Sequence, residues 1–223
     1  MTENINSQDY WDHRFSSGDW EAKNGRWQTQ CFARGQIQHL NIARGFNGTI
    51  LDFGCGLGDA MPVYREHFPQ AKLMGMDLSS QAVELCRRKY GKWATFLQGR
   101  AENVPEGIDV IIASNVLEHL DSDVEVAKCL FSKCSDLYIV VPYRESPLFG
   151  EHVNSYDENH FSALGPCEQK IFACRGWSAY GVELWYRTYF KNIFRFLLRR
   201  PLRSRNFQIL FHFKGSRVAR PMP

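Results

Sequence analysis

Short apolar runs recur along the chain between longer segments of mixed polarity, and each run has the length of a buried strand. The segments between the runs carry helix signals, and strands that alternate with helices predict a parallel sheet. The sequence therefore predicts an α/β fold. Seven strands are expected, at residues 50–53, 72–76, 93–97, 108–114, 136–141, 169–175 and 207–214.

Helices are expected between these strands. Residues 59–68 form the first predicted crossover helix. One of the two serines at 79–80 is expected to cap a second helix over residues 81–90, because a serine hydroxyl accepts a hydrogen bond from first-turn amides. A third helix is expected over residues 121–134. Before the first strand, residues 8–48 are expected to form a helical lead-in.

A glycine-rich turn, TILDFGCGLGD at residues 49–59, joins the first strand to the first helix. Glycine recurs at positions 54, 56 and 58, and it lets the backbone adopt turn conformations and lets a ligand approach the main chain. Asp77 follows nineteen residues after Gly58, at the end of the second strand. An acidic side chain there can accept both hydroxyls of a ribose. The two signals together predict a nucleotide-binding site.

The glycine spacing bears on which nucleotide is bound. A dinucleotide fingerprint reads G-x-G-x-x-G and places a pyrophosphate at a helix N-terminus. Here the spacing is G-x-G-x-G, and the carboxylate of Asp52 on the preceding strand would repel a pyrophosphate. This carboxylate suits a ligand with an ammonium or sulfonium group. An NAD-dependent oxidoreductase, which shares the first strand–helix–strand unit, is the alternative that the spacing disfavours.

Residues 49–59 resemble motif I of the class I S-adenosylmethionine (SAM) methyltransferases, and Met76-Asp77-Leu78-Ser79 resembles their second motif. The resemblance covers residues 45–145 well and the flanks more loosely. It implies a Rossmann-like, doubly wound α/β fold with a seven-stranded, mostly parallel sheet of order 3-2-1-4-5-7-6. It also implies SAM as the cofactor. In these two motifs the resemblance assigns to the cofactor Asp52, Gly54, Gly56, Gly58, Asp77 and Leu78.

Residues 98–105, QGRAENVP, resemble the third motif of the family. The family usually has an aspartate where this chain has Arg100, and that aspartate accepts a hydrogen bond from the adenine amino group. An arginine side chain has no acceptor atom. The resemblance implies that Ala101 and Glu102 contact the adenine, with Glu102 or a main-chain carbonyl as the acceptor.

The fourth strand leads into NVLEHL at residues 115–120, and ligands of open α/β sheets bind at the carboxyl ends of the strands. This sequence resembles the motif at the same place in methyltransferases that act on small molecules. The resemblance places Asn115 beside the methionine part of SAM and His119 near the transferred methyl group. A purely structural role is the alternative for His119.

A polar loop, YRESPLFGEHVNSY at residues 143–156, follows the fifth strand. Its best candidate for a general base is His152, because imidazole titrates near neutral pH. We expect His119 or His152 to deprotonate or align the methyl acceptor; an ordinary polar loop is the alternative. No cluster of Asp, Glu and His with ligand spacing is visible, so no metal is expected. The Asn/Asp-Pro-Pro-Tyr tetrad typical of nucleic-acid methyltransferases is absent, so no nucleic-acid partner is expected.

The composition, with 44% hydrophobic and 23% charged residues, is that of a globular protein. No apolar run approaches the ~18 residues of a spanning helix, and the N-terminus lacks the pattern of a secretory signal. Seven cysteines without a C-x-x-C pair favour free thiols in a reducing compartment over disulfides or zinc. These features predict a cytoplasmic protein.

Basic residues are concentrated at the C-terminal end. Residues 175–223 contain eleven Lys or Arg and one acidic residue, although the net charge of the whole chain is only +3. Between the last two strands, a basic residue recurs at every fourth position from Arg187 to Arg199, which forms one stripe on a helix with aromatic residues opposite. Such a helix either covers the sheet or lies on a membrane. We expect peripheral contact with an anionic membrane through residues 182–205.

The predicted organisation is a helical lead-in over residues 1–48 and a SAM-binding domain over residues 49–223, with a basic helical insertion at about 180–203. The predicted function is transfer of a methyl group from SAM to an oxygen or nitrogen of a small molecule. The basic segment extends this to a glycan or lipid-linked acceptor at the inner membrane surface. A non-catalytic adaptor with the same fold at a membrane surface is the alternative, because Arg100 departs from the family pattern.

Overall fold

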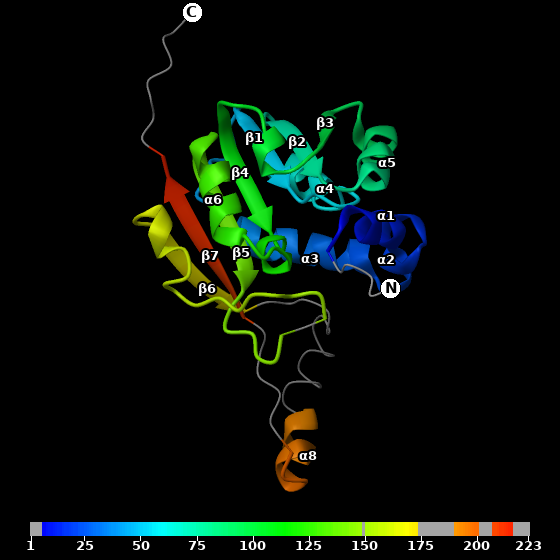
Figure 1. Cartoon of the computed structure of the whole chain (residues 1–223), viewed down its shortest axis with the longest axis vertical. Coiled ribbons are helices and arrows are strands. Elements are labelled where there is room, and N and C mark those ends of the chain that lie inside the picture. Colours follow the sequence, from blue (N-terminus) through cyan, green and yellow to red (C-terminus); the bar gives the residue numbers. More distant parts are fainter. Residues whose placement is uncertain (1–5, 149, 174–189, 201–206, 216–223) are drawn as a thin grey trace, which may run out of the picture.

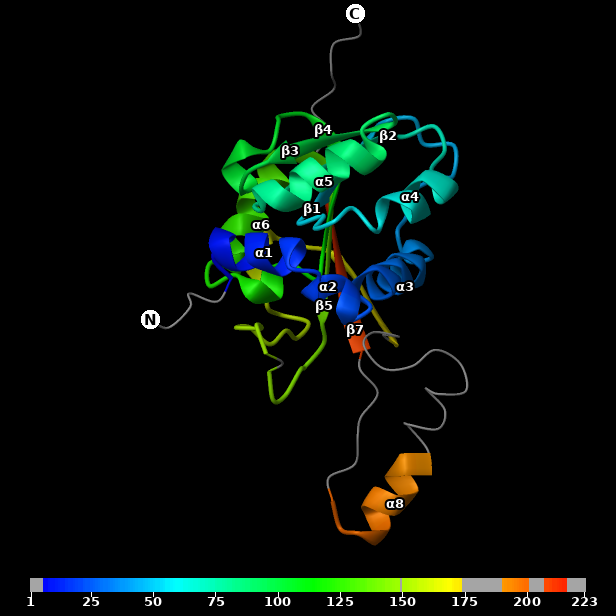
Figure 2. The same cartoon turned by 90° about the vertical axis from the view of Figure 1, so that its right-hand side faces the viewer.

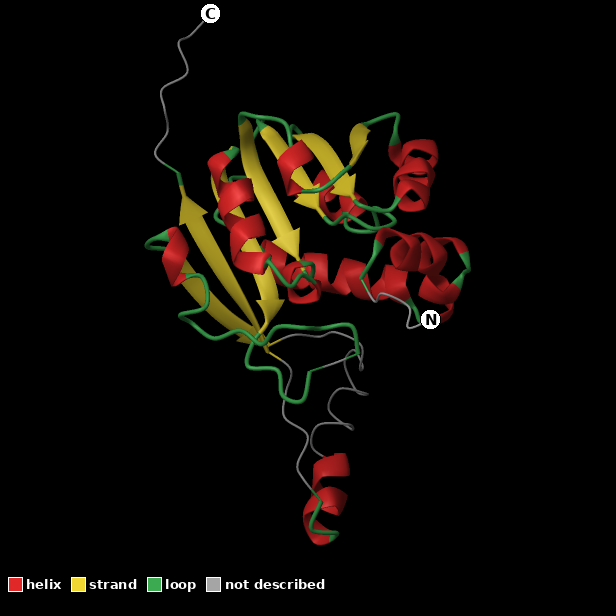
Figure 3. Ribbon diagram, in the orientation of Figure 1, coloured by secondary structure: helices red, strands yellow, loops and turns green. Residues whose placement is uncertain are grey.

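A seven-stranded sheet lies at the centre of the computed structural model, which describes residues 6–148, 150–173, 190–200 and 207–215 (Figure 1, Figure 3). Its order, β3-β2-β1-β4-β5-β7-β6, is the predicted one. Strands β1 to β5 pair in parallel, and β7 runs antiparallel to both β5 and β6. The strands are β1 Thr49–Phe53, β2 Lys72–Asp77, β3 Ala94–Gln98, β4 Ile108–Ser114, β5 Cys134–Pro142, β6 Glu168–Ala173 and β7 Phe207–Lys214.

Helices cover both faces of the sheet (Figure 2). Alternate residues of a central strand point to opposite faces, so Ile50 and Leu51 belong to different halves of the core. Side chains of α3, α4 and α5 pack in the half that contains Ile50, and side chains of α6 pack in the other half. The helices are α1 Gln8–Ser16, α2 Asp19–Ala22, α3 Gly25–Ile37, α4 Met61–His67, α5 Ser80–Tyr90, α6 Asp123–Ser132 and α8 Lys191–Leu197, with short 3-10 turns η1 Ala101–Asn103, η2 Leu117–His119 and η3 Ser162–Leu164.

The predicted helices between the strands are confirmed, with small shifts at their ends. The helix expected over 59–68 is Met61–His67, and the helix expected over 121–134 is Asp123–Ser132. The helical lead-in consists of α1, α2 and α3. Residues 174 and 175, which were expected to end the sixth strand, lie outside the described residues.

The N-terminus of α5 is capped as predicted and is also the place where α1 docks. The Ser79 hydroxyl accepts a hydrogen bond from the amide of Ala82 at 3.1 Å, and it donates one to the Asp12 carboxylate at 2.5 Å. The Asp12 carboxylate also accepts a hydrogen bond from the Gln81 amide at 3.2 Å. These contacts hold α1 against the end of α5, beside the glycine-rich turn.

Helix α8 is the described part of the predicted insertion, and it lies away from the sheet in both views (Figure 1, Figure 2). Its apolar side chains face solvent, with exposed fractions of 56% for Ile193, 72% for Phe196 and 69% for Leu197. The alternative that this segment simply covers the sheet is therefore wrong for the described residues. The remainder of the predicted insertion, including residues 180–189, lies outside them. No helix in the described ranges is long and apolar enough to span a membrane.

Candidate functional site

The glycine-rich turn after β1 adopts backbone conformations that favour glycine. Gly54, Gly56 and Gly58 have φ angles of +74°, +50° and +67°, all in the left-handed region. A Cβ atom on Gly54 would lie 2.3 Å from the side chain of Val116, so the turn also packs too closely for a larger residue. A Cβ atom on Gly58 would meet Cys86 and Tyr90 of α5 at 3.0 Å. The turn thus brings main-chain amides to the carboxyl end of β1.

Asp77, at the end of β2, holds this turn in place. One carboxylate oxygen accepts a hydrogen bond from the Gly56 amide at 2.7 Å, and the other accepts one from the Ser79 amide at 2.9 Å. Burial raises the pKa of Asp77 above its usual value, while these hydrogen bonds act in the opposite direction. The residue expected to bind a ribose is therefore also a structural tie between β2 and the glycine turn.

Asp52 is buried on β1 and lies close enough to Asp77 for their charges to interact. Burial, and then the charge of Asp77, raise the pKa of Asp52 to about 8. A positively charged ligand beside Asp52 would favour its ionised form. The electrostatics of this end of the site therefore favour a cation.

A cavity of about 870 Å³ opens beside these residues, within the usual range for a small-molecule site. All but one of the residues predicted to contact cofactor or acceptor line it. Gly58 is the exception, since it packs against α5. The predicted residues in the lining are Asp52, Gly54, Gly56, Asp77, Leu78, Ala101, Glu102, Asn115, His119 and His152.

Helix α3 contributes two buried polar side chains, Gln28 and Gln36, to the cavity lining. The side chain of Gln36 donates to the Tyr64 hydroxyl at 2.8 Å and accepts from the Ser114 hydroxyl at 2.7 Å. Gln28 also lines the cavity, and its buried Oε1 atom has no hydrogen-bond partner within the described part of the chain. The sequence signal for these buried groups is that polar residues stand at positions where an amphipathic helix would carry apolar ones. Gln28 thus presents an unsatisfied acceptor to the cavity.

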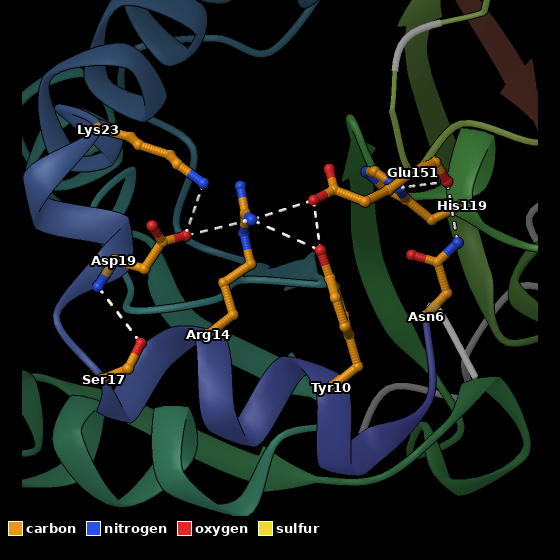
Figure 4. A network of polar contacts seen from close by, with 8 residues as sticks. All are labelled: Asn6, Tyr10, Arg14, Ser17, Asp19, Lys23, His119 and Glu151. Carbon is orange, nitrogen blue, oxygen red and sulfur yellow. Dashed lines mark hydrogen bonds and ion pairs between the residues drawn. The ribbon is translucent and has the colours of Figure 1, made fainter. Parts of the chain in front are cut away.

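The lead-in closes one side of the cavity through a network centred on Glu151 (Figure 4). The Tyr10 hydroxyl donates to the Glu151 carboxylate at 2.5 Å, and Arg14 forms an ion pair with it at 3.0 Å. The Glu151 main-chain oxygen accepts from Asn6 at 2.9 Å and from Nδ1 of His119 at 3.2 Å. Burial and the Glu151 carboxylate raise the pKa of Tyr10 to about 12. Glu151 therefore links α1 to the loop after β5 and to His119.

The two candidate catalytic histidines lie next to each other on this side of the cavity. The ring centroids of His119 and His152 are 4.9 Å apart, and the indole of Trp11 packs edge-on against His119. Burial and the charge of His152 lower the pKa of His119 to about 4. Burial opposes the charged form of His152 as well, but its 2.5 Å hydrogen bond to Glu145 and the nearby Glu118 raise its pKa. The structure therefore brings both candidate histidines to one place.

Comparison with known proteins identifies a known domain within the chain. Residues 51–136 match the family profile of a methyltransferase domain. Malonyl-[acyl-carrier protein] O-methyltransferase of Halalkalibacterium halodurans is 33% identical over 91 residues, which cover 37% of this chain and 34% of that protein. The chain carries a class I SAM-dependent methyltransferase domain. Because the match spans about a third of the length of this curated relative, it bears on the domain and not on a whole protein.

Solved structures show the same fold as this methyltransferase domain. A chain from the complex between the Trm112 methyltransferase activator of Haloferax volcanii and a putative methyltransferase has a TM-score of 0.67 at 14% identity, covering 97% of this chain and 99% of that one. The plantazolicin methyltransferase BpumL, in complex with SAH, has a TM-score of 0.56 at 18% identity and covers 94% of this chain and 95% of that one. The predicted Rossmann-like fold is confirmed.

The residues of this methyltransferase domain suit SAM, the cofactor that the family uses. The methionine part of SAM carries an ammonium group, and the cavity offers it the carboxylate of Asp52 and the Oε1 atom of Gln28, to which no described residue donates a hydrogen bond. The adenine end is less typical. Arg100 lines the cavity, and its main-chain amide donates a hydrogen bond to Oδ1 of Asn103 at 2.9 Å. The NAD-dependent alternative is disfavoured by the family match.

Proposed function

We propose that this protein transfers a methyl group from SAM to an oxygen or nitrogen of a small molecule. The observation that carries the proposal is that one cavity joins the glycine turn and Asp77 at one end to His119 and His152 at the other. A methyltransferase needs these two halves, because the donor and the acceptor must meet inside one enclosed site.

The donor half is assigned residue by residue. Asp52 and Gln28 bind the ammonium of the methionine part, and Asp77 accepts the ribose hydroxyls. Leu78, Ala101 and Glu102 surround the adenine, with Glu102 or a main-chain carbonyl accepting from its amino group. The amides of the glycine turn approach the ligand from β1, and Asn115 borders the methionine part. When bound, SAM supplies a methyl group on a positively charged sulfur, which is already activated for transfer.

The acceptor half is formed by η2, the loop after β5 and helix α1. His119 and His152 face the acceptor, and Trp11 lines the same end of the cavity against His119. A hydroxyl acceptor must lose its proton as its oxygen bonds to the methyl carbon, while the carbon–sulfur bond breaks and its electron pair stays on sulfur. Holding the acceptor in line is worth roughly 7–11 kcal/mol of barrier in well-oriented reactions. The curated relative is an O-methyltransferase by name, which favours oxygen over nitrogen.

We further propose that the acceptor is a glycan or a lipid-linked molecule. Helix α8 and the residues beside it expose apolar side chains at 190, 193, 194 and 197, the spacing of one helical face. Arg199 and Arg200 are exposed next to this face. An exposed apolar face beside basic residues suits the interface of an anionic membrane. The protein would then meet its acceptor at the membrane surface.

The experiment that tests the proposal follows labelled methyl groups from SAM into separate polar and lipid fractions of a metabolite extract. We expect the wild type to label an acceptor, and His119→Ala and His152→Ala to lose roughly 10²–10⁴-fold in rate, the usual contribution of a positioned base. SAM binding should persist in both variants. His67→Ala is the matched control, because His67 lies on α4 outside the cavity lining. Wild-type rates in both His119 and His152 variants would contradict the assigned roles.

A further inference from the structure

Three potential metal ligands converge at the acceptor end of the cavity. Glu118 and His119 are consecutive residues of η2, and His152 comes from the loop after β5. One ligand atom from each residue lies within 4.8 Å of the others, and all three residues line the cavity. Three side chains from two separate segments thus surround one point that a ligand in the cavity can reach.

Glu118 is unusual within this group because its carboxylate is buried without a hydrogen bond. The residue is 1% exposed, and neither of its carboxylate oxygens has a partner in the described part of the chain. A buried carboxyl group with no partner is energetically costly, because it has lost its hydrogen bonds to water. The two imidazole rings are close enough to be partners, yet no hydrogen bond joins either to Glu118. One oxygen of this carboxylate nevertheless lies within 4.8 Å of a nitrogen of each ring.

Each histidine is instead held through its Nδ1 atom by a group outside the cluster. Nδ1 of His119 meets the main-chain oxygen of Glu151 at 3.2 Å, and Nδ1 of His152 meets the Glu145 carboxylate at 2.5 Å. Both partners are acceptors, so Nδ1 carries the proton in each ring and the lone pair of the neutral ring is on Nε2. Metal-binding histidines are characteristically fixed in this way, by a carboxylate or carbonyl that accepts from the other ring nitrogen.

We propose that Glu118, His119 and His152 bind a divalent first-row transition-metal ion, of the class of Zn²⁺, Mn²⁺ or Co²⁺. Two imidazoles and one carboxylate suit such borderline ions, whereas Mg²⁺ and Ca²⁺ prefer oxygen ligands. The surroundings also favour a cation, because the carboxylate of Glu145 contacts His152. The nearby Arg14 does not oppose it strongly, since it is paired with Glu151 and Asp19.

Three protein ligands leave coordination positions open, and these face the cavity. The ion binds the acceptor oxygen there and lowers the pKa of the acceptor hydroxyl, as a metal does for bound water. The hydroxyl proton would pass to solvent water as the acceptor oxygen bonds to the methyl carbon and the carbon–sulfur bond of SAM breaks. This role rests on the methyl transfer proposed above, but the binding of the ion does not. His119 and His152 then align the acceptor through the metal.

A Co²⁺ titration of the chelator-treated full chain, followed by visible absorption, tests the site without an acceptor. We expect the wild type to bind one Co²⁺ with the absorption of a low-coordinate nitrogen and oxygen site, and Zn²⁺ to displace it. Glu118→Gln and His152→Asn should each weaken Co²⁺ binding by roughly 100-fold. Glu145→Gln should weaken it by about 10–100-fold, the usual cost of losing an outer partner of a ligand. Variants of two ligands are measured, so that the test remains if one variant does not fold. Circular dichroism would reveal such a failure.

His67→Asn is the matched control, because the Nδ1 atom of His67 meets the Val63 carbonyl at 3.0 Å without belonging to the cluster. Co²⁺ affinity in His67→Asn should equal that of the wild type. Binding that is undetectable in the wild type, or equal in the wild type and the folded Glu118 and His152 variants, would overturn the proposal. SAM is titrated into the same samples. SAM binding without Co²⁺ binding refutes the metal site alone, whereas Co²⁺ binding without SAM binding refutes the proposed methyl transfer alone.

Discussion

Two aspartates at the carboxyl ends of β1 and β2 illustrate how single residues prepare this site. Asp77 is satisfied by the amides of Gly56 and Ser79, at 2.7 and 2.9 Å. Asp52 is buried nearby, and its pKa rises to about 8 through burial and the charge of Asp77. An ionised Asp52 therefore destabilises the fold when no cation is bound. A ligand that brings a positive charge offsets this cost, which ties the stability of the domain to its cofactor.

The stability of the ligand-free protein should therefore depend on the protonation of Asp52. Because the pKa of Asp52 is about 8 in the folded protein and its ordinary value is 3.8, the folded state keeps a proton that the unfolded state loses between these values. The stabilisation that the protonated Asp52 contributes is complete at low pH and is lost as the pH rises toward 8. We expect the wild type to lose up to about 1.4 kcal/mol per pH unit relative to Asp52→Asn between pH 5 and 7.

Urea unfolding at several pH values measures this difference, since other titrating groups are common to both proteins. Asp9→Asn is the control, because Asp9 is exposed on α1. Its stability should run parallel to that of the wild type. Parallel curves for Asp52→Asn as well would show that Asp52 is ionised in the folded protein across this range.

The residues of the donor half were predictable because their signals are local. The glycines and Asp52 stand within one turn, and Asp77 follows at the end of the next strand. The grouping of Glu118 with His152 was not predictable, because 33 positions separate the two residues and only the folded loop joins them. Gln36 was also missed as a cavity-lining residue, since a polar residue on a helix reads as exposed until its packing is known.

At the scale of elements, the lead-in and the insertion differ in how they meet the domain. Helix α1 is anchored at two points, by Asp12 on the end of α5 and by Tyr10 on Glu151. Neither anchor was visible in the sequence, because each joins segments more than sixty residues apart. Helix α8 has its apolar face exposed. Its helical pattern was predictable, but what it packs against depends on tertiary structure.

The exposed face of α8 should bind vesicles that contain anionic lipid. We expect sedimentation with such vesicles to rise with anionic lipid and to fall with salt, because each nearby Lys or Arg contributes about 1 kcal/mol at an anionic surface. Arg199→Glu combined with Arg200→Glu should reduce binding by roughly tenfold or more. Ile193→Ser combined with Leu197→Ser should also reduce it, through lost apolar contact.

Arg88→Glu provides the matched charge control, because Arg88 is an exposed residue of α5 that pairs with Glu84 at 2.7 Å. Its vesicle binding should remain close to that of the wild type. Equal sedimentation with neutral and anionic vesicles, or none with either, would contradict the membrane proposal and leave the acceptor among soluble small molecules.

At the scale of the molecule, the sheet order places the functional segments side by side. Strands β2, β1, β4 and β5 are neighbours and parallel, so the segments after them meet at one edge. The glycine turn, Asp77, η2 and the loop with His152 are those segments. The meeting of these segments at one edge could be predicted from the motifs, because right-handed crossover connections restrict the possible arrangements of parallel strands. The closing of the cavity by α1 and α3 could not be predicted from the motifs, because it depends on contacts between side chains that are distant in sequence.

The central claim is that this cavity binds SAM, and calorimetric titration tests it most directly. SAM and NAD are titrated separately into the wild type and Asp77→Asn, with Asp9→Asn as the control. We expect the wild type and Asp9→Asn to bind one SAM and no measurable NAD at the same concentration. Asp77→Asn should bind SAM at least about tenfold more weakly, because a carboxylate is the stronger acceptor for ribose hydroxyls. Binding of NAD in place of SAM, or unchanged SAM affinity in a normally folded Asp77→Asn protein, would contradict the account.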